Sequence, residues 1–311
     1  MAVSYLYPVM DQPNLTVLTE AVVQRVVIEK AKAVGVAFTW NGQQHVVRAH
    51  HEVVLSLGAF NTPRTLMLSG IGEENELRRL GIPAISALPG VGANFQDHTL
   101  VATCLFEANE PFESRNNKAE ATLFWGSQSG QATPDIQPFL IEMPHLSDVH
   151  RSYAAANTWS LSPAIIRPQS RGRLRLRSAD PADDLSLEWS PLGTSEEMRI
   201  LRAATELCRH IGNSSEMRPF VRRELLPGAA YAENLTDFIR NGVTSYGHAS
   251  CTAKMGRDAM SVVDSRLKVY GVDNLRIADA SIMPNITLGN TMAPCVLIGE
   301  RLGEILSTTN G

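Results

Sequence analysis

The chain of 311 residues is 44% hydrophobic and 19% charged, which is enough for one large or two ordinary domains with hydrophobic cores. Its formal net charge of −4 gives no electrostatic reason to expect a nucleic acid or an anionic membrane as a partner. No stretch approaches the roughly 18 apolar residues of a membrane-spanning helix. The four cysteines lack C-x-x-C spacing and indicate neither a zinc site nor a disulfide framework, so we expect no metal site.

The first predicted elements are strands. Residues 14–28 are rich in Val, Leu and Thr and predict one strand. A hairpin is expected next, with strands over 34–40 and 44–49 joined by Asn41-Gly42, a dipeptide that suits tight hairpin turns. We therefore expect strand and turn in the first fifty residues.

A strand–turn–helix connection is predicted after the hairpin. The continuous apolar run over 53–57 indicates a strand buried on both faces, as in a parallel sheet. The strand should end at Gly58, and Asn61-Thr62-Pro63 predict the cap and first-turn proline of a helix over 64–69. Such a crossover can face a cofactor, although an ordinary strand–helix connection has the same pattern.

The rest of the chain mixes short strands and helices. Residues 73–80 predict a helix, 89–98 a loop with two glycines, and 99–192 short alternating strands with proline-rich joints. Further expected elements are helices over 194–211 and 233–240, a strand pair over 267–272 and 275–278, and a terminal helix from Pro294.

Three runs of small and polar residues carry the candidate chemistry. They are G-A-F-N-T-P-R-T-L-M-L-S-G-I-G at 58–72, L-P-G-V-G-A-N-F-Q-D-H at 88–98, and the stretch 245–294 with H-A-S-C-T-A-K-M-G at 248–256 and G-N-T-M-A-P at 289–294. Within the last stretch, His248 and Asn290 lie among small residues, where a ligand could approach the backbone closely. Both side chains can handle a proton or an alkoxide, so this stretch is the candidate site.

The last stretch resembles the C-terminal catalytic region of the glucose-methanol-choline (GMC) flavin oxidoreductases. In that family a His in a pattern like H-x-x-G-T-x-x-M-G pairs with a second His or Asn followed by T-x-A-P. His248 and Asn290 occupy these positions, and the chain departs from the pattern at Cys251, where Gly is usual. The runs at 58–72 and 88–98 also resemble family signatures. The resemblance covers nearly the whole chain.

The resemblance implies a fold of mixed α+β and α/β class. It consists of a partial, Rossmann-like FAD-binding domain plus an antiparallel-sheet substrate-binding domain. A full family member opens with a G-x-G-x-x-G turn that holds the FAD pyrophosphate, and no such run exists here. We therefore expect the C-terminal portion of the fold, with 1–98 as the remainder of the FAD-binding domain, 99–245 as mainly the substrate-binding domain, and 246–311 as the catalytic segment that returns to the FAD-binding domain.

The resemblance also assigns roles to single residues. Flavin-dependent alcohol oxidation needs a base for the hydroxyl proton and a hydride path to flavin N5, and His suits the first role because its pKa lies near neutrality. His248 is thus the expected base, and Asn290 the group that orients the substrate oxygen. His98 is expected to be a structural or cofactor-shell residue. The expected FAD contacts are Val23, Asp279, Ala280, Asn290, Thr291 and Met292.

Three functions remain open from the sequence. The first is an FAD-dependent oxidoreductase that acts on the CH-OH group of a small, apolar or secondary-metabolite alcohol, present as a partial or split chain. The second is non-redox chemistry such as cyclisation, dehydration or lyase cleavage by His248 and Asn290 on the same scaffold. The third is a non-catalytic remnant whose sheet edge seeks a partner. A separate N-terminal flavin-binding half or a second copy of the chain is the expected protein partner.

Three structural and binding expectations follow. His248 and Asn290 should face each other across one pocket at roughly 4 to 7 Å, as paired hydrogen-bonding roles demand. Asp97, Asp279 and the turn over 58–72 should border one cavity that holds the cofactor. The chain alone should bind FAD poorly, because it lacks the backbone amides that hold the pyrophosphate.

Overall fold

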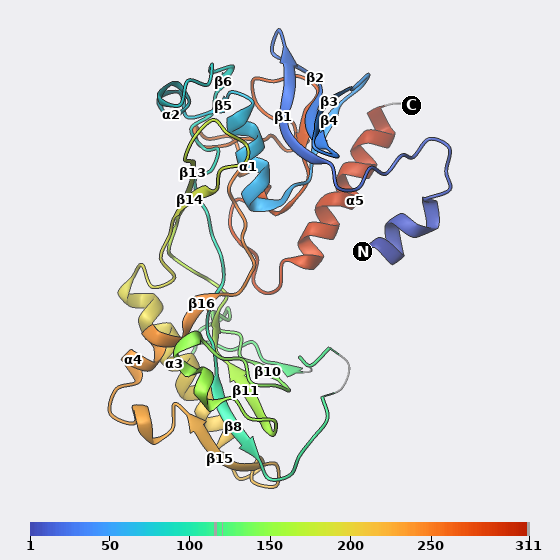
Figure 1. Cartoon of the computed structure of the whole chain (residues 1–311). Helices are drawn as coiled ribbons and strands as arrows, with labels where there is room; N and C mark the ends of the chain where they lie inside the picture. The colour runs from blue at the N-terminus through green and yellow to red at the C-terminus, as the bar shows by residue number, and fades with distance from the viewer. Residues whose placement is uncertain (115–116, 120, 310–311) are drawn as a thin grey trace.

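The computed structural model describes residues 1–114, 117–119 and 121–309, so residues 115, 116, 120, 310 and 311 of the expected domain ranges lie outside the described residues. Figure 1 shows two units, and the chain passes between them more than once. One unit carries the amino-terminal strands, α1 and α2 together with the terminal helix α5. The other holds a five-stranded antiparallel sheet with α3 and α4. The expected α+β architecture is confirmed.

The amino-terminal sheet contains the predicted hairpin. Strands β1 (Val22–Glu29), β2 (Lys32–Trp40) and β3 (Gln43–Arg48) pair antiparallel in that order. The β2–β3 turn places Asn41 and Gly42 at φ 49° and 74°, the left-handed conformation that a tight hairpin turn requires.

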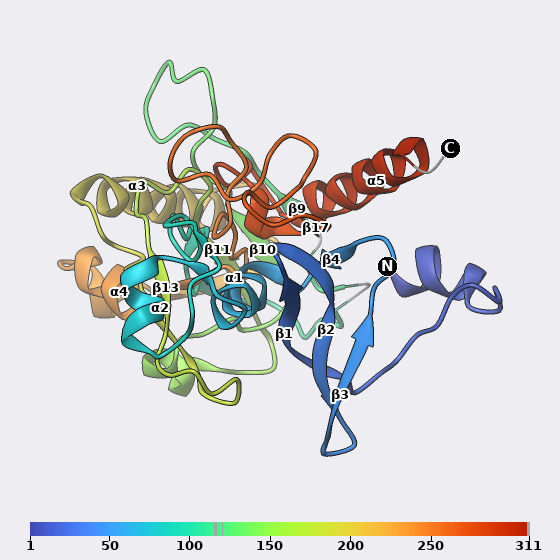
Figure 2. The ribbon, with the colours of Figure 1, turned by 90° about the horizontal axis from the view of Figure 1, so that it is seen from above.

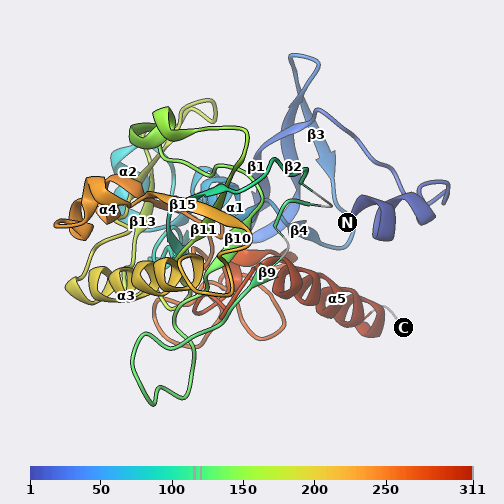
Figure 3. The ribbon, with the colours of Figure 1, turned by 90° about the horizontal axis from the view of Figure 1, so that it is seen from below.

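The strand predicted from residue 14 begins only at β1, so residues 14–21 were assigned wrongly. Their composition suits a strand, but no other strand pairs with them, and Leu15, Val17 and Leu18 are exposed. The segment before them forms two short helical turns, η1 (Ala2–Leu6) and η2 (Tyr7–Val9), with no buried residue. Figures 2 and 3 show this segment projecting beside α5.

Strand β4 (Val53–Leu55) pairs in parallel with β17 (Leu275–Ile277). The expectation that β4 is buried on both faces is wrong, because Val54 is 37% exposed in this two-stranded sheet. The predicted pairing of 267–272 with 275–278 is confirmed in part, because Lys268 and Arg276 form an antiparallel bridge, flanked by backbone bonds from Val269 to Leu275 and from Ile277 to Leu267, while β17 takes β4 as its strand partner.

Helix α1 (Gly58–Leu68) begins six residues before the predicted start. The carboxylate of Asp279 accepts hydrogen bonds from the Gly58 amide at 3.0 Å and the Thr62 hydroxyl at 2.6 Å, so a residue distant in sequence stabilises the helix start. Pro63 therefore lies inside the helix, where it leaves the carbonyl of Ala59 without an amide donor.

The orphaned Ala59 carbonyl is satisfied by a side chain of the 248–256 run. The hydroxyl of Thr252, which is fully buried, donates to it at 2.7 Å. This bond ties the 58–72 signature to the 248–256 run.

The remaining elements of this unit are short, except for the 18-residue helix α5. They are β5 (Ile71–Gly72), α2 (Glu74–Arg79), β6 (Ser86–Ala87), β13 (Arg173–Leu176), β14 (Leu185–Glu188), η5 (Ala280–Ile282) and α5 (Met292–Thr309). Leu302 and Ile305 of α5 join a core that also contains Leu66 of α1 and Ile277 of β17. None of the described helices is long and apolar enough to cross a membrane.

The second unit is a sheet covered by helices. Its strand order is β15 (Val221–Leu226), β8 (Cys104–Ala108), β11 (Thr158–Ser162), β10 (Phe139–Ile141) and β9 (Ala121–Thr122), and its helical segments are η3 (Asp148–Tyr153), α3 (Ser195–Gly212), η4 (Ala229–Tyr231) and α4 (Leu235–Gly242). Helix α3 begins as predicted, with a capping box between Thr194 and Glu197.

A small sheet lies where the chain enters and leaves this unit. Strand β7 (Thr99–Val101) pairs antiparallel with both β12 (Ala164–Ile165) and β16 (Val243–Ser245). The register places Thr99 opposite Ser245. The residues that flank this pair therefore meet at one point, between the two units.

The hydroxyl of Thr252 provides a test of the link between the two signatures. Thr252→Val keeps the shape of the side chain but leaves the buried Ala59 carbonyl unpaired, which should lower the free energy of unfolding by about 1–3 kcal/mol. Thr252→Ser keeps the donor and should cost clearly less. Urea denaturation of both variants measures the difference, and equal losses would show that the hydrogen bond contributes nothing.

Candidate functional site

The site forms because two strands fix which loops become neighbours. Since Thr99 and Ser245 pair, the backbone amide of Tyr246 continues the ladder and donates to the carbonyl of His98 at 2.9 Å. His98 precedes β7 and His248 follows β16, so the antiparallel register brings two distant histidines together.

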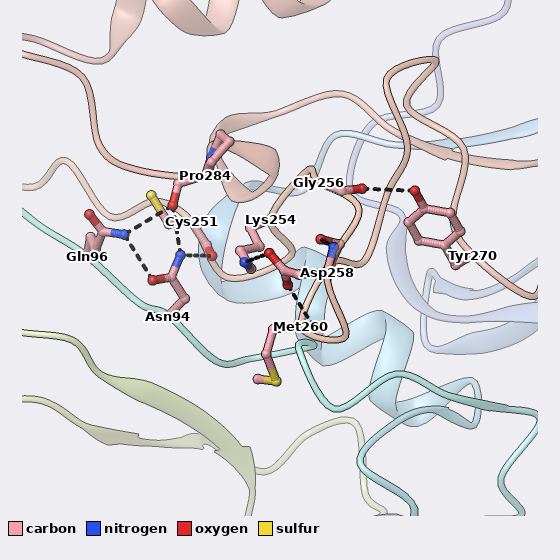
Figure 4. A network of polar contacts seen from close by, with 10 residues as sticks. Asn94, Gln96, Cys251, Lys254, Gly256, Asp258, Met260, Tyr270 and Pro284 are labelled. Carbon is pink, nitrogen blue, oxygen red and sulfur yellow. Dashed lines mark hydrogen bonds and ion pairs between the residues drawn. The ribbon is translucent and has the colours of Figure 1, made fainter.

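A second set of bonds holds the loop before His98 against the stretch 245–294 (Figure 4). The side-chain amide of Asn94 donates to the carbonyls of Pro284 at 3.0 Å and Cys251 at 3.4 Å. Gln96 exchanges backbone bonds with Ser250, and its side chain accepts from the Ile286 amide. The three sequence runs thus form one folded core around the site.

Two glycines allow this clamp to close. A Cβ on Gly90 would lie 2.0 Å from the carbonyl oxygen of Met260, and one on Gly92 would lie 2.5 Å from that of Leu174. Cys251 stands where the family pattern has Gly, and it adopts a left-handed φ of 74°, a conformation that costs a non-glycine residue roughly 1–2 kcal/mol. The backbone shape that glycine favours is kept despite the substitution.

A row of side chains runs through the site. The Nε2 atom of His98 lies 3.0 Å from the carbonyl oxygen of Thr287, and the Nδ1 atoms of His98 and His248 lie 2.9 Å apart. The Nε2 atom of His248 lies 3.4 Å from Nδ2 of Asn290, whose Oδ1 accepts from the Gln137 side chain at 3.3 Å. His248 and Asn290 therefore face each other as predicted, but closer than the expected 4 to 7 Å, because they touch directly.

Asp97 holds the backbone of this row. Its carboxylate accepts from the amide of His248 at 2.9 Å and from the Ser245 hydroxyl at 2.5 Å. Burial raises the pKa of Asp97, and these hydrogen bonds oppose the rise. Both carboxylate oxygens are engaged, so Asp97 fixes the loop that carries His248.

Both histidines favour the neutral form. Burial, followed by the nearness of His248, lowers the pKa of His98 from its usual 6.5 to about 4. Burial also lowers the pKa of His248, which is half-buried. A neutral imidazole is the form that can accept a proton, so His248 is available as a base at neutral pH.

Aromatic rings line one side of the pair. Tyr246 lies against His248 with ring centroids 4.3 Å apart and stacks on Phe139 at 5.0 Å. The Tyr246 phenol also interacts with the side chain of Asn290. The ring of Phe124 lies next to Gly289, so apolar surface adjoins the two polar groups.

The residues expected to contact FAD occupy different places. Asn290 and Met292 are both exposed to solvent, and Met292 is 68% exposed. Ala280 accepts from the Cys251 amide, which places it directly behind the motif. Val23 is separate from this group, on β1, where it pairs with Phe38.

The carboxylate of Asp279 holds the starts of two helical segments, and the expected contact of this residue with FAD stays a prediction. Its carboxylate caps α1 and its own helical turn, with a third bond from the Ser281 amide at 2.8 Å. It therefore belongs to a different hydrogen-bond network from Asp97, and a shared cavity of these two residues with the turn over 58–72 stays a prediction. A carboxylate at the amino end of α1 also leaves that end unsuited to a phosphate group.

The residues present fit one end of a flavin better than the other. Asn290, Thr291 and Met292 offer an open face of polar and soft apolar groups beside His248, which suits the ring system. For the pyrophosphate, the sequence has no G-x-G-x-x-G turn, and α1 is already capped by Asp279.

A cavity lies beside the histidine pair rather than at it. Its volume is about 900 Å³, and its walls include Gln96, Asp135, Arg167, Arg171, Glu196 and Leu288. Arg199 adds a third arginine to this lining against two carboxylates, so its charge is mixed with a small positive excess. We place the candidate site at His248 and Asn290 because hydrogen-bonding groups converge there. Among the described residues, no cluster of His, Cys, Asp or Glu could hold a metal ion.

Two contacts of the hydrogen-bonded row were not predicted from the sequence. The D-H pair that ends the 88–98 run signalled His98, but nothing in the sequence linked its ring to His248. Gln137, which is 1% exposed and contacts Asn290, stands in no motif and gave no signal.

Acidification should destabilise the fold through His98. Because its folded pKa of about 4 lies below the usual 6.5, the unfolded state binds more protons between these values. The stability that depends on the neutral ring is complete above pH 6.5 and is lost towards pH 4, at roughly 1.4 kcal/mol per pH unit.

We expect the unfolding free energy of the wild type, measured with urea, to fall more steeply over this window than that of His98→Gln, which carries no titrating ring. If the unfolding free energies of the two proteins fall equally with pH, His98 has the same pKa in the folded and the unfolded state.

Comparisons with known proteins agree on the family. The amino-terminal and carboxy-terminal models described as GMC oxidoreductase match residues 1–100 and 168–299. Mitochondrial choline dehydrogenase of Mus musculus is 37% identical over 98% of this chain and 56% of its own length. An alcohol dehydrogenase (acceptor) of Pseudomonas putida is 35% identical over 97% of this chain and 60% of its own length.

The fold is also similar to that of a solved structure. The crystal structure of pyridoxine 4-oxidase from Mesorbium loti superposes with a TM-score of 0.90 at 32% identity, over 96% of this chain and 59% of that one. The chain thus spans little more than half the length of the relatives that it matches. With both family models matched and identity above one third, this chain belongs to the GMC oxidoreductase family.

Proposed function

We propose that this chain carries the substrate side and the catalytic pair of an FAD-dependent oxidoreductase that acts on the CH-OH group of a small alcohol. The observation that carries the proposal is the contact between His248 Nε2 and Asn290 Nδ2 at 3.4 Å, at an exposed edge between the two units. The relatives, named as choline and alcohol dehydrogenases and as pyridoxine 4-oxidase, support alcohol oxidation as the reaction class.

His248 is the proposed base. Its lowered pKa keeps the ring neutral at physiological pH, and its Nε2 atom is the ring nitrogen that faces Asn290. A substrate hydroxyl placed between the two side chains would give its proton to Nε2 and accept a hydrogen bond from the Asn290 amide. The second bond stabilises the negative charge that develops on oxygen as the proton leaves.

FAD, when bound, supplies the acceptor for the hydride from the alcohol carbon. We propose that Asn290, Thr291 and Met292 lie beside its ring system, that Asp279 and Ala280 lie near its pyrophosphate and ribityl chain, and that Val23 lies on its adenine side. The proposed organisation follows the sequence expectation, with 1–98 and 246–311 on the flavin side and 99–245 mainly on the substrate side.

The aromatic surroundings favour an apolar alcohol. Phe124, Phe139 and Tyr246 provide apolar surface next to the pair. Asp97, the nearest carboxylate, has both oxygens engaged by Ser245 and His248 and offers no free partner to a cationic group. We therefore propose a neutral alcohol with an apolar body as the substrate class.

Replacement of the base tests the chemistry directly. In flavin-loaded protein, His248→Ala should lower the anaerobic rate of alcohol-dependent flavin reduction by about 10²- to 10⁴-fold, as expected for loss of a general base. In the wild type this rate should fall at acid pH, with a midpoint below 6.5, because burial lowers the pKa of His248.

The control is His210→Ala, an exposed histidine on α3, which should leave the rate unchanged. An unaltered rate in His248→Ala would remove the proposed base. If alcohols are consumed without any flavin reduction, the non-redox alternative of cyclisation, dehydration or lyase chemistry replaces the proposal.

The affinity for FAD tests how the cofactor is held. Calorimetric titration of this chain alone should give binding weaker than about micromolar, because no glycine-rich turn is present and Asp279 occupies the amino end of α1. Addition of a family amino-terminal half that carries the glycine-rich turn should strengthen the binding. Micromolar or tighter binding by the chain alone would show that the main anchor lies elsewhere.

A further inference from the structure

We propose that His98 is a positioning residue that fixes the tautomer of His248, so that the ring nitrogen facing the substrate is the one without a proton. The inference rests on the proposed function for its catalytic meaning, but the tautomer itself can be measured without any reaction. The row of hydrogen bonds that contains both histidines has one end of known polarity.

That end is the backbone carbonyl of Thr287. A carbonyl oxygen can only accept, so Nε2 of His98, 3.0 Å away, must carry a proton. His98 is fully buried, and its pKa of about 4 keeps it neutral at physiological pH. A neutral ring has one N–H only, so Nδ1 of His98 is bare and can act only as an acceptor.

The second ring follows from the first. The Nδ1 atoms of His98 and His248 lie 2.9 Å apart, a distance at which one of them must supply a proton. Since Nδ1 of His98 is bare, Nδ1 of His248 is the donor. The neutral ring of His248 then has a bare Nε2, directed at Asn290.

The far end of the row is consistent with this direction. The Nδ2 atom of Asn290 lies 3.4 Å from the bare Nε2 and can donate to it. The Oδ1 atom of Asn290 accepts from the buried side chain of Gln137. Each proton in the row therefore points away from Gln137 and towards Thr287.

The consequence concerns the base. In the opposite tautomer Nε2 of His248 would carry a proton and could not accept one from an alcohol. When the proposed reaction gives a proton to Nε2, the imidazolium keeps its Nδ1–H bond to His98, so the ring holds its orientation during the transfer. His98 thus performs, as a neutral acceptor, the orienting task that a carboxylate performs in the Ser-His-Asp triad.

Three variants separate this role from a packing role. His98→Phe keeps a ring of similar size but removes both nitrogens, and His98→Gln can still donate to Thr287 but has no acceptor near Nδ1 of His248. His98→Asp restores an acceptor-only group at that point. Circular dichroism and urea denaturation identify which variants fold.

The primary readout is nitrogen-15 NMR of histidine-labelled chain at slightly alkaline pH, with His248 assigned by the signals that His248→Gln lacks. We expect His248 in the wild type to have a protonated Nδ1 and a bare Nε2. The protonated Nε2 form should appear in His98→Phe and His98→Gln, and the wild-type pattern should return in His98→Asp. A His248 that keeps Nδ1–H in folded His98→Phe and His98→Gln would overturn the inference.

The second readout is the anaerobic rate of flavin reduction in flavin-loaded protein. It should fall at least about 10- to 100-fold in His98→Phe and His98→Gln, the loss seen when the partner that orients a metal-ligating histidine is removed. His98→Asp should recover most of the rate, which a variant that merely disturbs packing would not do. Rates at the wild-type level in His98→Phe would overturn the inference.

The two proposals fail in different ways. If the NMR pattern responds to His98 as expected but no protein reduces flavin with any alcohol, the oxidoreductase proposal fails and the tautomer assignment stands. If the wild type oxidises alcohols while the tautomer of His248 is the same in the wild type and the His98 variants, the oxidoreductase proposal stands and the positioning role fails.

Discussion

The antiparallel pairing of β7 with β16 is the constraint on which the site depends. This short ladder sets Thr99 opposite Ser245 and continues through the bond from Tyr246 to His98. A shift by one residue would turn every side chain of one strand to the other face and separate the two imidazoles. The contact between His98 and His248 is therefore a product of strand register, fixed at the point where the chain passes between its two units.

The surrounding hydrogen bonds stabilise the register of this strand pair. Asn94 and Gln96 tie the loop before β7 to the catalytic stretch, and Asp97 holds the amide of His248. Thr252 satisfies the carbonyl that Pro63 leaves open in α1, so the helix start is coupled to the same stretch. Functional geometry within about 0.5 Å needs this kind of support, because an exposed loop alone would not hold two side chains in one orientation.

Much of the site could be predicted from the sequence, because its chemistry is local. The runs around His248 and Asn290 identified the pair, and the structure brings them into direct contact. Helix α3 and the hairpin at Asn41 were also predictable, because a capping box and a tight turn depend on a few adjacent residues.

The sequence predictions were wrong where the local structure depends on residues that are distant in the sequence. Residues 14–21 have strand composition but no strand to pair with, and β17 takes the distant β4 as its parallel partner while it meets the nearer segment 267–272 at a single bridge. The start of α1 depends on Asp279, which is 221 residues away from Gly58. The role of His98 depends on a carbonyl 189 residues later, at Thr287, so no local pattern could reveal it.

The central claim is that His248 and Asn290 share one substrate oxygen. A crystal structure of the flavin-loaded protein with an unreactive analogue of an apolar alcohol tests it most directly. We expect the oxygen of the ligand to lie roughly 2.6–3.2 Å from both Nε2 of His248 and Nδ2 of Asn290. An analogue that binds instead in the cavity lined by Arg167 and Arg171, away from both side chains, would contradict the account.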